Sequence, residues 1–153
     1  MSDFSTGSAS VVVRRSPHQV WAVLADVTRM GEWSPECIAC RWVGGATGPA
    51  VDASFEGDNV AKVGGRVMKR WTTTSKVTAC EPGAVFEFVA EGYTTWRYEF
   101  AAEGDGTRVT ERFSYEPKGF QGFMYDTVMR RPSMMTKGMQ ATLDRAKAAI
   151  EAS

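Results

Sequence analysis

Two cysteines spaced as C-x-x-C are the residues of this sequence whose types and spacing most directly suggest chemistry. Cys37 and Cys40 have the spacing that is typical of half a zinc site or of a redox pair. The chain has no second such motif; its third cysteine is Cys80, and its only histidine, His18, lies where a helix is expected to start. In a strand, positions 37 and 40 would point to opposite faces. The sequence therefore predicts ordinary buried or half-buried thiols, with no metal and no cofactor.

The stretch "ADVTRMGEWSPE", residues 25–36, brings acids close to a large aromatic side chain. Asp26, Glu32 and Glu36 could do acid–base work only in a buried setting or beside a partner that shifts their pKa. Nothing in the pattern supplies such a setting, so these acids are expected to be exposed. Trp33 is the informative residue, and we expect it at the rim of a binding pocket. The alternative is ordinary packing of Trp33 on the surface or in the core.

Glu111 is the best remaining candidate for proton transfer. It alternates with Val109 and Phe113 in "TRVTERFSY", which places it on the inward, apolar face of a strand. Burial of an unpaired carboxylate raises its pKa and would suit it to act as a proton donor. The preferred interpretation is structural: an inward Thr73 or Lys69 satisfies the carboxylate, or Glu111 lies at the solvent end of its strand.

The first elements follow from local signals. Residues 9–14, "ASVVVR", are apolar and β-branched, which is typical of a strand. In the following "SPHQ", Ser16 can cap a helix, Pro17 suits its first position, and Gln19 completes a capping box. The helix is expected to run to about Asp26, and one or two further turns follow before a proline ends them.

The hydrophobic period changes to two from residue 37 to residue 116, which predicts strands. The links between them are short and rich in glycine, so consecutive strands should pair as an antiparallel meander. No second helix interrupts them, and this argues against a parallel α/β fold. Six strands are expected within residues 37–45, 51–59, 66–80, 84–90, 93–103 and 107–115.

The remainder of the chain, residues 120–151, is helical in pattern. One uninterrupted helix would overhang the sheet, and Pro132 lies where a break would prevent this. We therefore expect a short helical piece and then a long helix that starts near Ser133. Its apolar stripe comprises Met135, Met139, Leu143, Ala146 and Ile150.

Composition limits the function classes. The 18 basic and 18 acidic residues give no net charge, and no basic stripe appears, which argues against nucleic-acid binding. No apolar run is long enough to span a membrane, and "MSDFSTGSAS" lacks the pattern of a signal peptide. The sequence thus predicts a cytoplasmic protein.

Three segments, "SPHQVWAVLADVTRMGEW", "EPG-AVFEF" and "YDTVMRRPSMMTKGMQATLDRAKAAIE", resemble the START-like helix-grip superfamily (SRPBCC), in its bacterial polyketide cyclase/dehydrase-like lipid-binding branch. The resemblance implies an α+β helix-grip fold, in which a seven-stranded curved antiparallel sheet wraps around a long C-terminal helix, with two short helices after the first strand. It also implies one domain, 1–153, with an ordered core of about 9–151, and a ligand cavity between sheet and helix. The family has no universal catalytic residues, so none is carried over.

The inward faces of the strands predict the same hollow, because one helix cannot bring all the inward aromatic side chains of a curved sheet into contact. For any one of these residues, filling of the core is an equally good interpretation. Methionines at 124, 129, 134, 135 and 139 suit a wall that adapts to apolar ligands, although helix packing alone would explain the last two. The predicted ligand-binding residues are Trp33, Phe55, Trp71, Phe86, Phe88, Trp96, Tyr98, Glu111, Phe113, Met135 and Met139.

Two functions remain open from the sequence. The preferred one is binding or transport, without catalysis, of a hydrophobic small molecule such as a lipid, polyketide or isoprenoid-like compound. The alternative is a polyketide cyclase or aromatase that uses the same cavity, with Glu111 as its proton donor.

Overall fold

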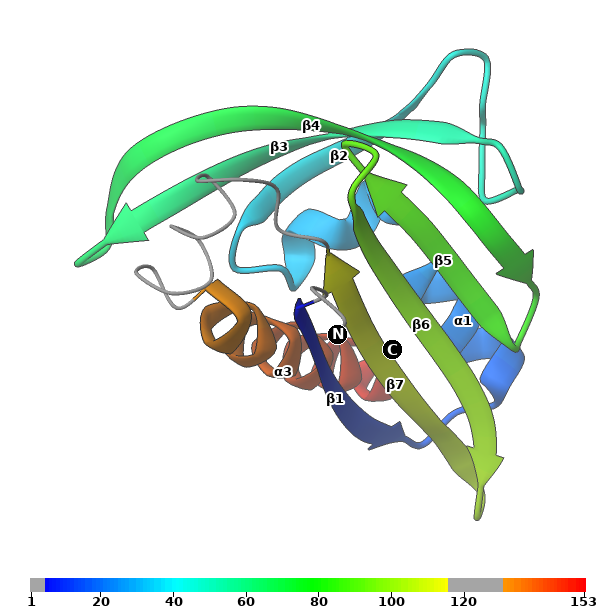
Figure 1. Ribbon diagram of the computed structural model, residues 1–153. Helices are drawn as coiled ribbons and strands as arrows, with labels where there is room; N and C mark the ends of the chain where they lie inside the picture. The colour runs from blue at the N-terminus through cyan, green and yellow to red at the C-terminus, as the bar shows by residue number, and fades with distance from the viewer. Residues whose placement is uncertain (1–4, 116–130) are drawn as a thin grey trace.

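The predicted meander is confirmed in the computed structural model, which describes residues 5–115 and 131–153, and the side chains of residues 6–115 and 136–153. Seven antiparallel strands form one sheet in the order β1-β7-β6-β5-β4-β3-β2 (Figure 1). Their bounds are β1 Ser5–Val13, β2 Cys37–Val43, β3 Ser54–Val63, β4 Arg66–Glu81, β5 Val85–Ala90, β6 Thr94–Glu103 and β7 Gly106–Tyr115.

Two short helices follow β1, as predicted. Helix α1, Pro17–Leu24, starts with the expected capping box, in which the Gln19 amide nitrogen donates to Ser16 Oγ at 3.2 Å and the Ser16 amide nitrogen donates to Gln19 Oε1 at 3.1 Å. The next turn is a 3₁₀ helix, η1, Val27–Glu32. Asp26 caps it by accepting from the Thr28 amide at 3.1 Å. These caps direct the chain across the end of the sheet and into β2.

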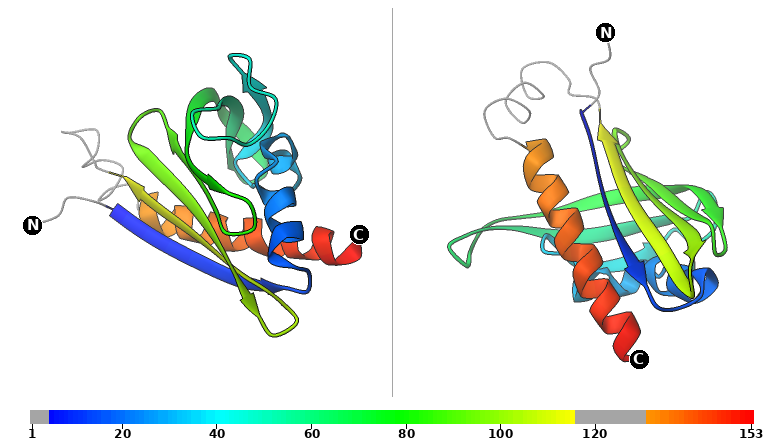
Figure 2. Two further views of the ribbon diagram at one scale, coloured as in Figure 1. Left: turned by 90° about the vertical axis from the view of Figure 1, so that its right-hand side faces the viewer. Right: turned by 90° about the horizontal axis from the view of Figure 1, so that it is seen from below.

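Helix α3, Arg131–Ala152, lies against β1 on the concave side of the sheet (Figure 2). It starts two residues before the predicted Ser133, because Pro132 fits the first turn, where a missing amide proton costs no hydrogen bond. The predicted stripe is buried at Met139, Leu143, Ala146 and Ile150. The short helical piece predicted before Pro132 and the side chain of Met135 lie outside the described residues.

The end of α3 is attached to the end of β1 by polar contacts. Lys147 Nζ donates to the Val12 carbonyl oxygen at 2.6 Å and to Glu151 Oε2 at 2.8 Å, and Glu151 Oε2 also accepts from the Arg14 amide at 2.9 Å. Among the described residues, no helix is both long and apolar enough to cross a membrane.

The absence of a side chain at Gly7 in β1 permits this close approach of helix to sheet. A Cβ atom there would lie 2.5 Å from Thr136 Oγ1 on α3 and 2.6 Å from Phe113 Cε1 on β7. Both distances are far shorter than van der Waals contact, so a side chain would force the helix or the Phe113 ring to move. Gly7 thus sets the depth at which α3 lies.

We predict that Gly7→Ala lowers the free energy of unfolding by about 1–3 kcal/mol, the usual cost of overpacking. Urea unfolding measures the loss. The control is Ser8→Ala, whose side chain points to the other face of β1 and should change stability by less than about 0.5 kcal/mol. Equal effects of the two substitutions would contradict the role of Gly7.

Candidate functional site

An open pocket of about 600 Å³ lies between the central strands, the η1–β2 connection and α3. Seven of the eleven predicted residues line it, namely Phe55, Trp71, Phe88, Trp96, Tyr98, Glu111 and Met139. Phe55, Phe88, Tyr98 and Glu111 at the inner end are almost fully buried, whereas Trp71 and Trp96 are half-buried. The two tryptophans are therefore the more exposed part of this lining.

Trp33 is not at the mouth, so that part of the prediction was wrong. Its side chain is only 2% exposed and packs in the main core. The guanidinium of Arg29 lies 5.2 Å from the ring centroid. The following residues Ser34, Pro35 and Glu36 line the pocket instead. The 3₁₀ turn rotates the indole inward, and neither a helix nor a strand pattern would indicate this.

Phe86 and Phe113 lie behind the wall rather than on the lining of the pocket. Phe86 is completely buried and packs with Phe88, their ring centroids 5.8 Å apart. Phe113 packs with Trp96 at 5.7 Å and with Tyr115 at 6.1 Å. Inward direction was correctly predicted for both, but other side chains separate them from the pocket.

A buried pair of polar residues closes the inner end. Glu111 and Tyr98 are directly opposite each other in the β6–β7 ladder, and the Tyr98 hydroxyl hydrogen-bonds to the Glu111 carboxyl group. Desolvation raises the pKa of Glu111 to about 8, and the hydrogen bond from Tyr98 opposes this rise only in part. Burial also raises the pKa of Tyr98 well above its usual value. Glu111 is therefore protonated at neutral pH.

One oxygen of this carboxyl group, Glu111 Oε1, is buried and has no hydrogen-bond partner among the described residues. The predicted partners are elsewhere, since Thr73 Oγ1 accepts from Asn59 Nδ2 at 3.2 Å and Lys69 Nζ lies 5.5 Å from the Trp71 ring centroid. The interpretation of Glu111 as satisfied by Thr73 or Lys69 was therefore wrong. An unsatisfied buried oxygen is costly unless a ligand or solvent completes it.

The two thiols of the C-x-x-C motif also line the pocket, on the same face of β2. A β-bulge between Cys37 and Ala39 adds one residue to the strand, so the prediction that positions 37 and 40 face opposite ways was wrong. The Sγ atoms of Cys37 and Cys40 lie 3.1 Å apart. This contact lowers the pKa of Cys37 and, with burial, raises that of Cys40. Across the ladder from Cys40, Gly57 leaves room for the sulfur atoms, because a Cβ there would lie 3.1 Å and 3.3 Å from them.

The polar part of the pocket wall was mostly missed from the sequence. Asn59 follows Gly57 on the inward face of β3, and Thr73 and Ser75 alternate with Trp71 on β4. That alternation in the sequence would have predicted that Thr73 and Ser75 face the pocket with Trp71. The pairing of Tyr98 with Glu111 could also have been predicted, because the two-residue turn between Glu103 and Gly106 determines which residues of β6 and β7 face each other. Among the described residues, no three His, Cys, Asp or Glu side chains converge as metal ligands.

We predict that a mild disulfide oxidant converts the Cys37–Cys40 pair to an intramolecular disulfide. The two thiols lose two hydrogens, and the oxidant is reduced to two thiols. Titration of the denatured protein should then find one free thiol, that of Cys80, in place of the three present before oxidation. Cys80→Ser should still form the disulfide and Cys40→Ser should not. Three free thiols after oxidation would contradict the prediction.

The pKa of Glu111 predicts how stability depends on pH. Between the unfolded value of 4.5 and the folded value of about 8, the folded protein retains a proton that the unfolded chain has released. Stability must therefore fall as pH rises through this window. Relative to Glu111→Gln, which cannot ionise, the wild-type protein should lose roughly 3–5 kcal/mol between pH 5 and pH 9. Urea unfolding of both proteins tests this, and parallel pH profiles would refute it.

Comparison with known proteins gives the relationships of the chain. The family model described as polyketide cyclase / dehydrase and lipid transport matches residues 6–151. The structure of a polyketide-cyclase-like protein from Corynebacterium glutamicum is 30% identical, with a TM-score of 0.67, and the match covers 99% of this chain and 94% of that one. An AHSA1-like protein from Aeromonas hydrophila is 23% identical, with a TM-score of 0.64 and coverage of 96% and 92%.

A further structural relative is the di-domain ARO/CYC StfQ from the steffimycin biosynthetic pathway. It is 15% identical with a TM-score of 0.74, and the match covers 97% of this chain and 51% of StfQ, which shows a shared fold. No protein with a curated description matches the sequence. Because the family match extends over nearly the whole chain, the protein belongs to the polyketide cyclase/dehydrase and lipid transport family of the START-like helix-grip superfamily.

Proposed function

We propose that the protein binds or carries a hydrophobic small molecule in the pocket between the sheet and α3. The observation that carries this proposal is the composition of the wall. Aromatic and apolar side chains surround about 600 Å³, and one buried carboxylic acid at the inner end has an oxygen without a partner. Pockets for small ligands usually have such a mainly apolar wall with a few polar groups that orient the ligand, and volumes of roughly 300–1,000 Å³.

The polar end of the pocket limits the chemistry of the ligand. Protonated Glu111 offers a hydroxyl donor as well as an acceptor oxygen, and Tyr98 engages only part of this capacity. A carbonyl or hydroxyl oxygen on the ligand would complete the remaining hydrogen bond. The apolar body would then lie beside Phe88, Trp96 and Trp71 toward the mouth. Lipid, polyketide and isoprenoid-like molecules all combine an apolar body with such a group.

A cyclase or aromatase reaction is the second candidate. In its favour, the pKa of Glu111 is about 8, close to neutral pH, and the group is inside the pocket. A proton donor is most effective when its pKa is near the working pH. Glu111 would then donate its proton to a carbonyl oxygen of a folded polyketide chain. The family description includes both cyclases and lipid transport, so it favours neither candidate.

Two tryptophans with different positions test the binding function. Trp96→Ser removes part of the pocket wall, whereas Trp33→Ser makes the same chemical change in the main core. Titration with a fluorescent naphthalene sulfonate dye, with displacement by fatty acids, measures binding. Trp96→Ser should weaken dye binding by about tenfold or more, from the lost apolar contact. Trp33→Ser should cost about 3–5 kcal/mol of stability and leave the affinity of the remaining folded protein nearly unchanged.

Further measurements separate a carrier from an enzyme. Native mass spectrometry of the purified protein shows whether a small molecule is retained and gives its mass. That molecule can then be incubated with wild-type protein and with Glu111→Gln. A carrier returns the molecule unchanged from both. An enzyme converts it, and Glu111→Gln abolishes conversion while it still binds. A wild-type protein that neither retains a molecule nor binds the dye would overturn the proposed function.

A further inference from the structure

The tip of the β3–β4 hairpin, residues 62–70, projects from the sheet as a two-stranded ribbon. Strand β2 pairs with β3 only as far as Asn59, and β5 pairs with β4 only from Ser75 onward. Gly64 and Gly65 form the turn with φ of 58° and 80°, and a Cβ on either would meet nothing within 4 Å. Beyond Asn59 and Ser75, no other described strand pairs with either strand of the tip.

The charge of this tip is strongly one-sided in a chain of zero net charge. The tip carries four cations and no acid, and no acidic residue occurs between Asp58 and Glu81. None of the four forms a salt bridge with a described acidic residue. The acids that precede the tip, Glu56 and Asp58, are both engaged by Arg41. The four cations, all exposed, are Lys62, Arg66, Lys69 and Arg70.

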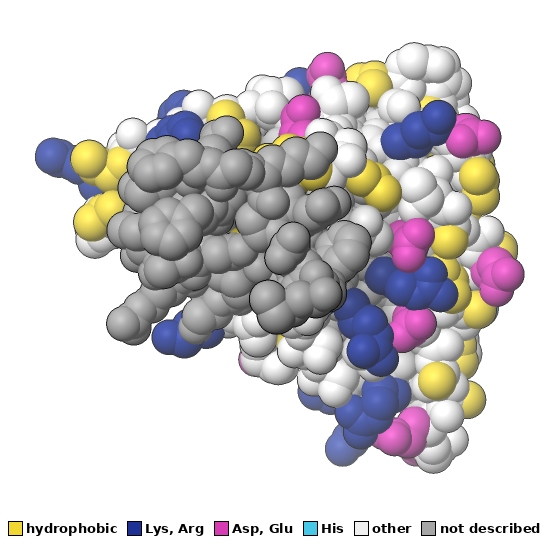
Figure 3. All heavy atoms as spheres, in the orientation of Figure 1, with side chains coloured by type: hydrophobic (Ala, Val, Ile, Leu, Met, Phe, Trp, Pro, Cys, Tyr) yellow, Lys and Arg dark blue, Asp and Glu magenta, His cyan; other side chains and the backbone are white. Residues whose placement is uncertain are grey.

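Apolar side chains are exposed among these cations. Val63 is 70% exposed and Met68 is 64% exposed, the two highest values among the exposed large hydrophobic residues of the described chain. Dark blue and yellow side chains gather at the same tip in Figure 3. An exposed apolar pair with surrounding cations differs from a simple solubilising surface, which would carry charges of both signs and few large apolar groups.

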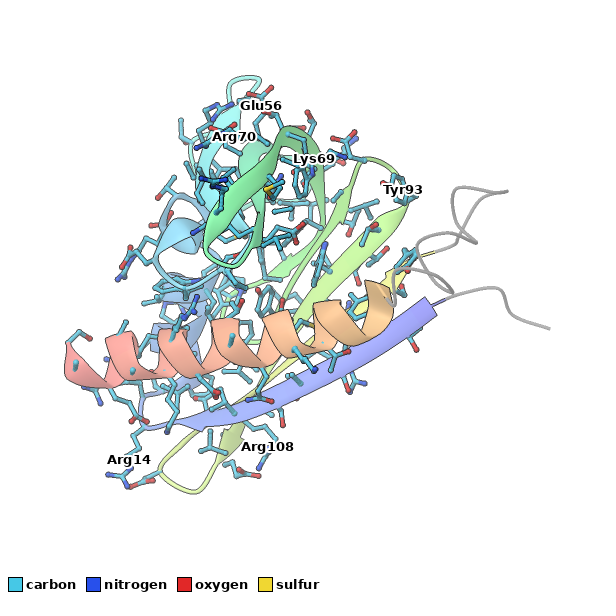
Figure 4. The ribbon with its side chains drawn as sticks, turned by 90° about the vertical axis from the view of Figure 1, so that its left-hand side faces the viewer. Arg14, Glu56, Lys69, Arg70, Tyr93 and Arg108 are labelled. Atoms are coloured by element: carbon cyan, nitrogen blue, oxygen red, sulfur yellow. The ribbon has the colours of Figure 1, made fainter. Side chains whose placement is uncertain are left out.

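The base of the hairpin forms part of the pocket mouth. Ala61, Lys62 and Trp71 line the pocket, so the projecting tip continues directly from its wall. Tyr93 at the β5–β6 turn also lines the pocket and is 51% exposed. Figure 4 shows Lys69 and Arg70 on the hairpin and Tyr93 at that turn, at the end of the molecule opposite Arg14 and Arg108.

We propose that the β3–β4 hairpin tip binds to an anionic membrane surface. Val63 and Met68 insert among the lipid headgroups, and the four cations contact the phosphate and carboxylate groups around them. Charge complementarity identifies the surface as anionic. The exposed valine and methionine favour a lipid surface over a nucleic acid, because they gain from transfer into an apolar layer.

This docking extends the proposed function, because it would turn the pocket mouth toward the lipid. An apolar ligand could then enter or leave along Trp71 with little exposure to water. Docking itself does not require an occupied pocket. The two proposals can therefore fail separately.

Co-sedimentation with vesicles tests the docking. We compare vesicles of phosphatidylcholine mixed with phosphatidylserine against vesicles of phosphatidylcholine alone. Wild-type protein should bind the anionic vesicles more tightly, and added salt should weaken that binding. Arg66→Ser with Arg70→Ser should weaken it about 25-fold, because each cation contributes about fivefold at an anionic surface. Val63→Ser with Met68→Ser should weaken it by about tenfold or more through lost insertion.

Matched controls change the same chemistry elsewhere. Arg14→Ser with Arg108→Ser removes the same charge at the opposite end of the molecule, and Val51→Ser replaces another exposed apolar residue, on the β2–β3 connection. Both should bind vesicles as the wild-type protein does. Circular dichroism and dye binding without vesicles should show that the hairpin variants retain their fold and pocket.

Three outcomes would overturn the proposal. Equal binding of the hairpin variants and the wild-type protein would exclude the tip as the contact. Wild-type protein that binds neither vesicle type would exclude a membrane and point to an acidic protein partner. Loss of binding in the arginine variant alone would exclude insertion of Val63 and Met68.

The Trp96→Ser variant distinguishes this proposal from the proposed function. If it binds vesicles as the wild-type protein does but no longer binds the dye, membrane docking does not depend on ligand binding in the pocket.

Discussion

Helix α3, together with the short α1 and η1, covers only part of the concave face of seven strands, and this mismatch in width determines where the pocket lies. Where α1 and the second half of α3 both reach the sheet, the core is continuous and includes Leu143, Ala146 and Ile150. A smaller cluster of Phe113, Tyr115 and Met139 forms farther toward the start of α3. The pocket has lining residues from both clusters, among them Phe88 and Tyr98 of the larger one and Met139 and Tyr115 of the smaller one.

The same mismatch explains the chemistry of Glu111. In a fully packed core, an unpaired carboxyl group would be replaced by an apolar side chain, because its burial is costly. Beside a pocket, the cost is reduced when the group is neutral and a second molecule can complete its hydrogen bonds. Tyr98 supplies one of these bonds from the adjacent strand. The pocket therefore makes it possible for Glu111 to be buried with one oxygen unpaired within the protein.

Local patterns predicted the elements well, because strand period, turn glycines and the Ser16–Gln19 capping box act over a few residues. The direction of individual side chains was less predictable. Trp33 follows a 3₁₀ turn, which has neither the period of an α-helix nor that of a strand. Cys37 and Cys40 share a face because of one extra residue in β2, and nothing in "CIAC" marks that bulge. Phe86 and Phe113 face inward as expected, but which inward residue reaches the pocket depends on neighbours from distant strands.

The bulge in β2 also has a consequence for self-association. Strand β2 is an edge of the sheet, with backbone groups that another chain could use to extend the ladder. At Cys37–Ala39 the regular spacing of these groups is interrupted, and the strand twists more strongly there. A straight strand from a second molecule therefore cannot follow β2 along its whole length. The extra residue of the β2 bulge brings Cys37 and Cys40 together on the inner face. It thus also makes the outer edge of β2 a poor template for aggregation.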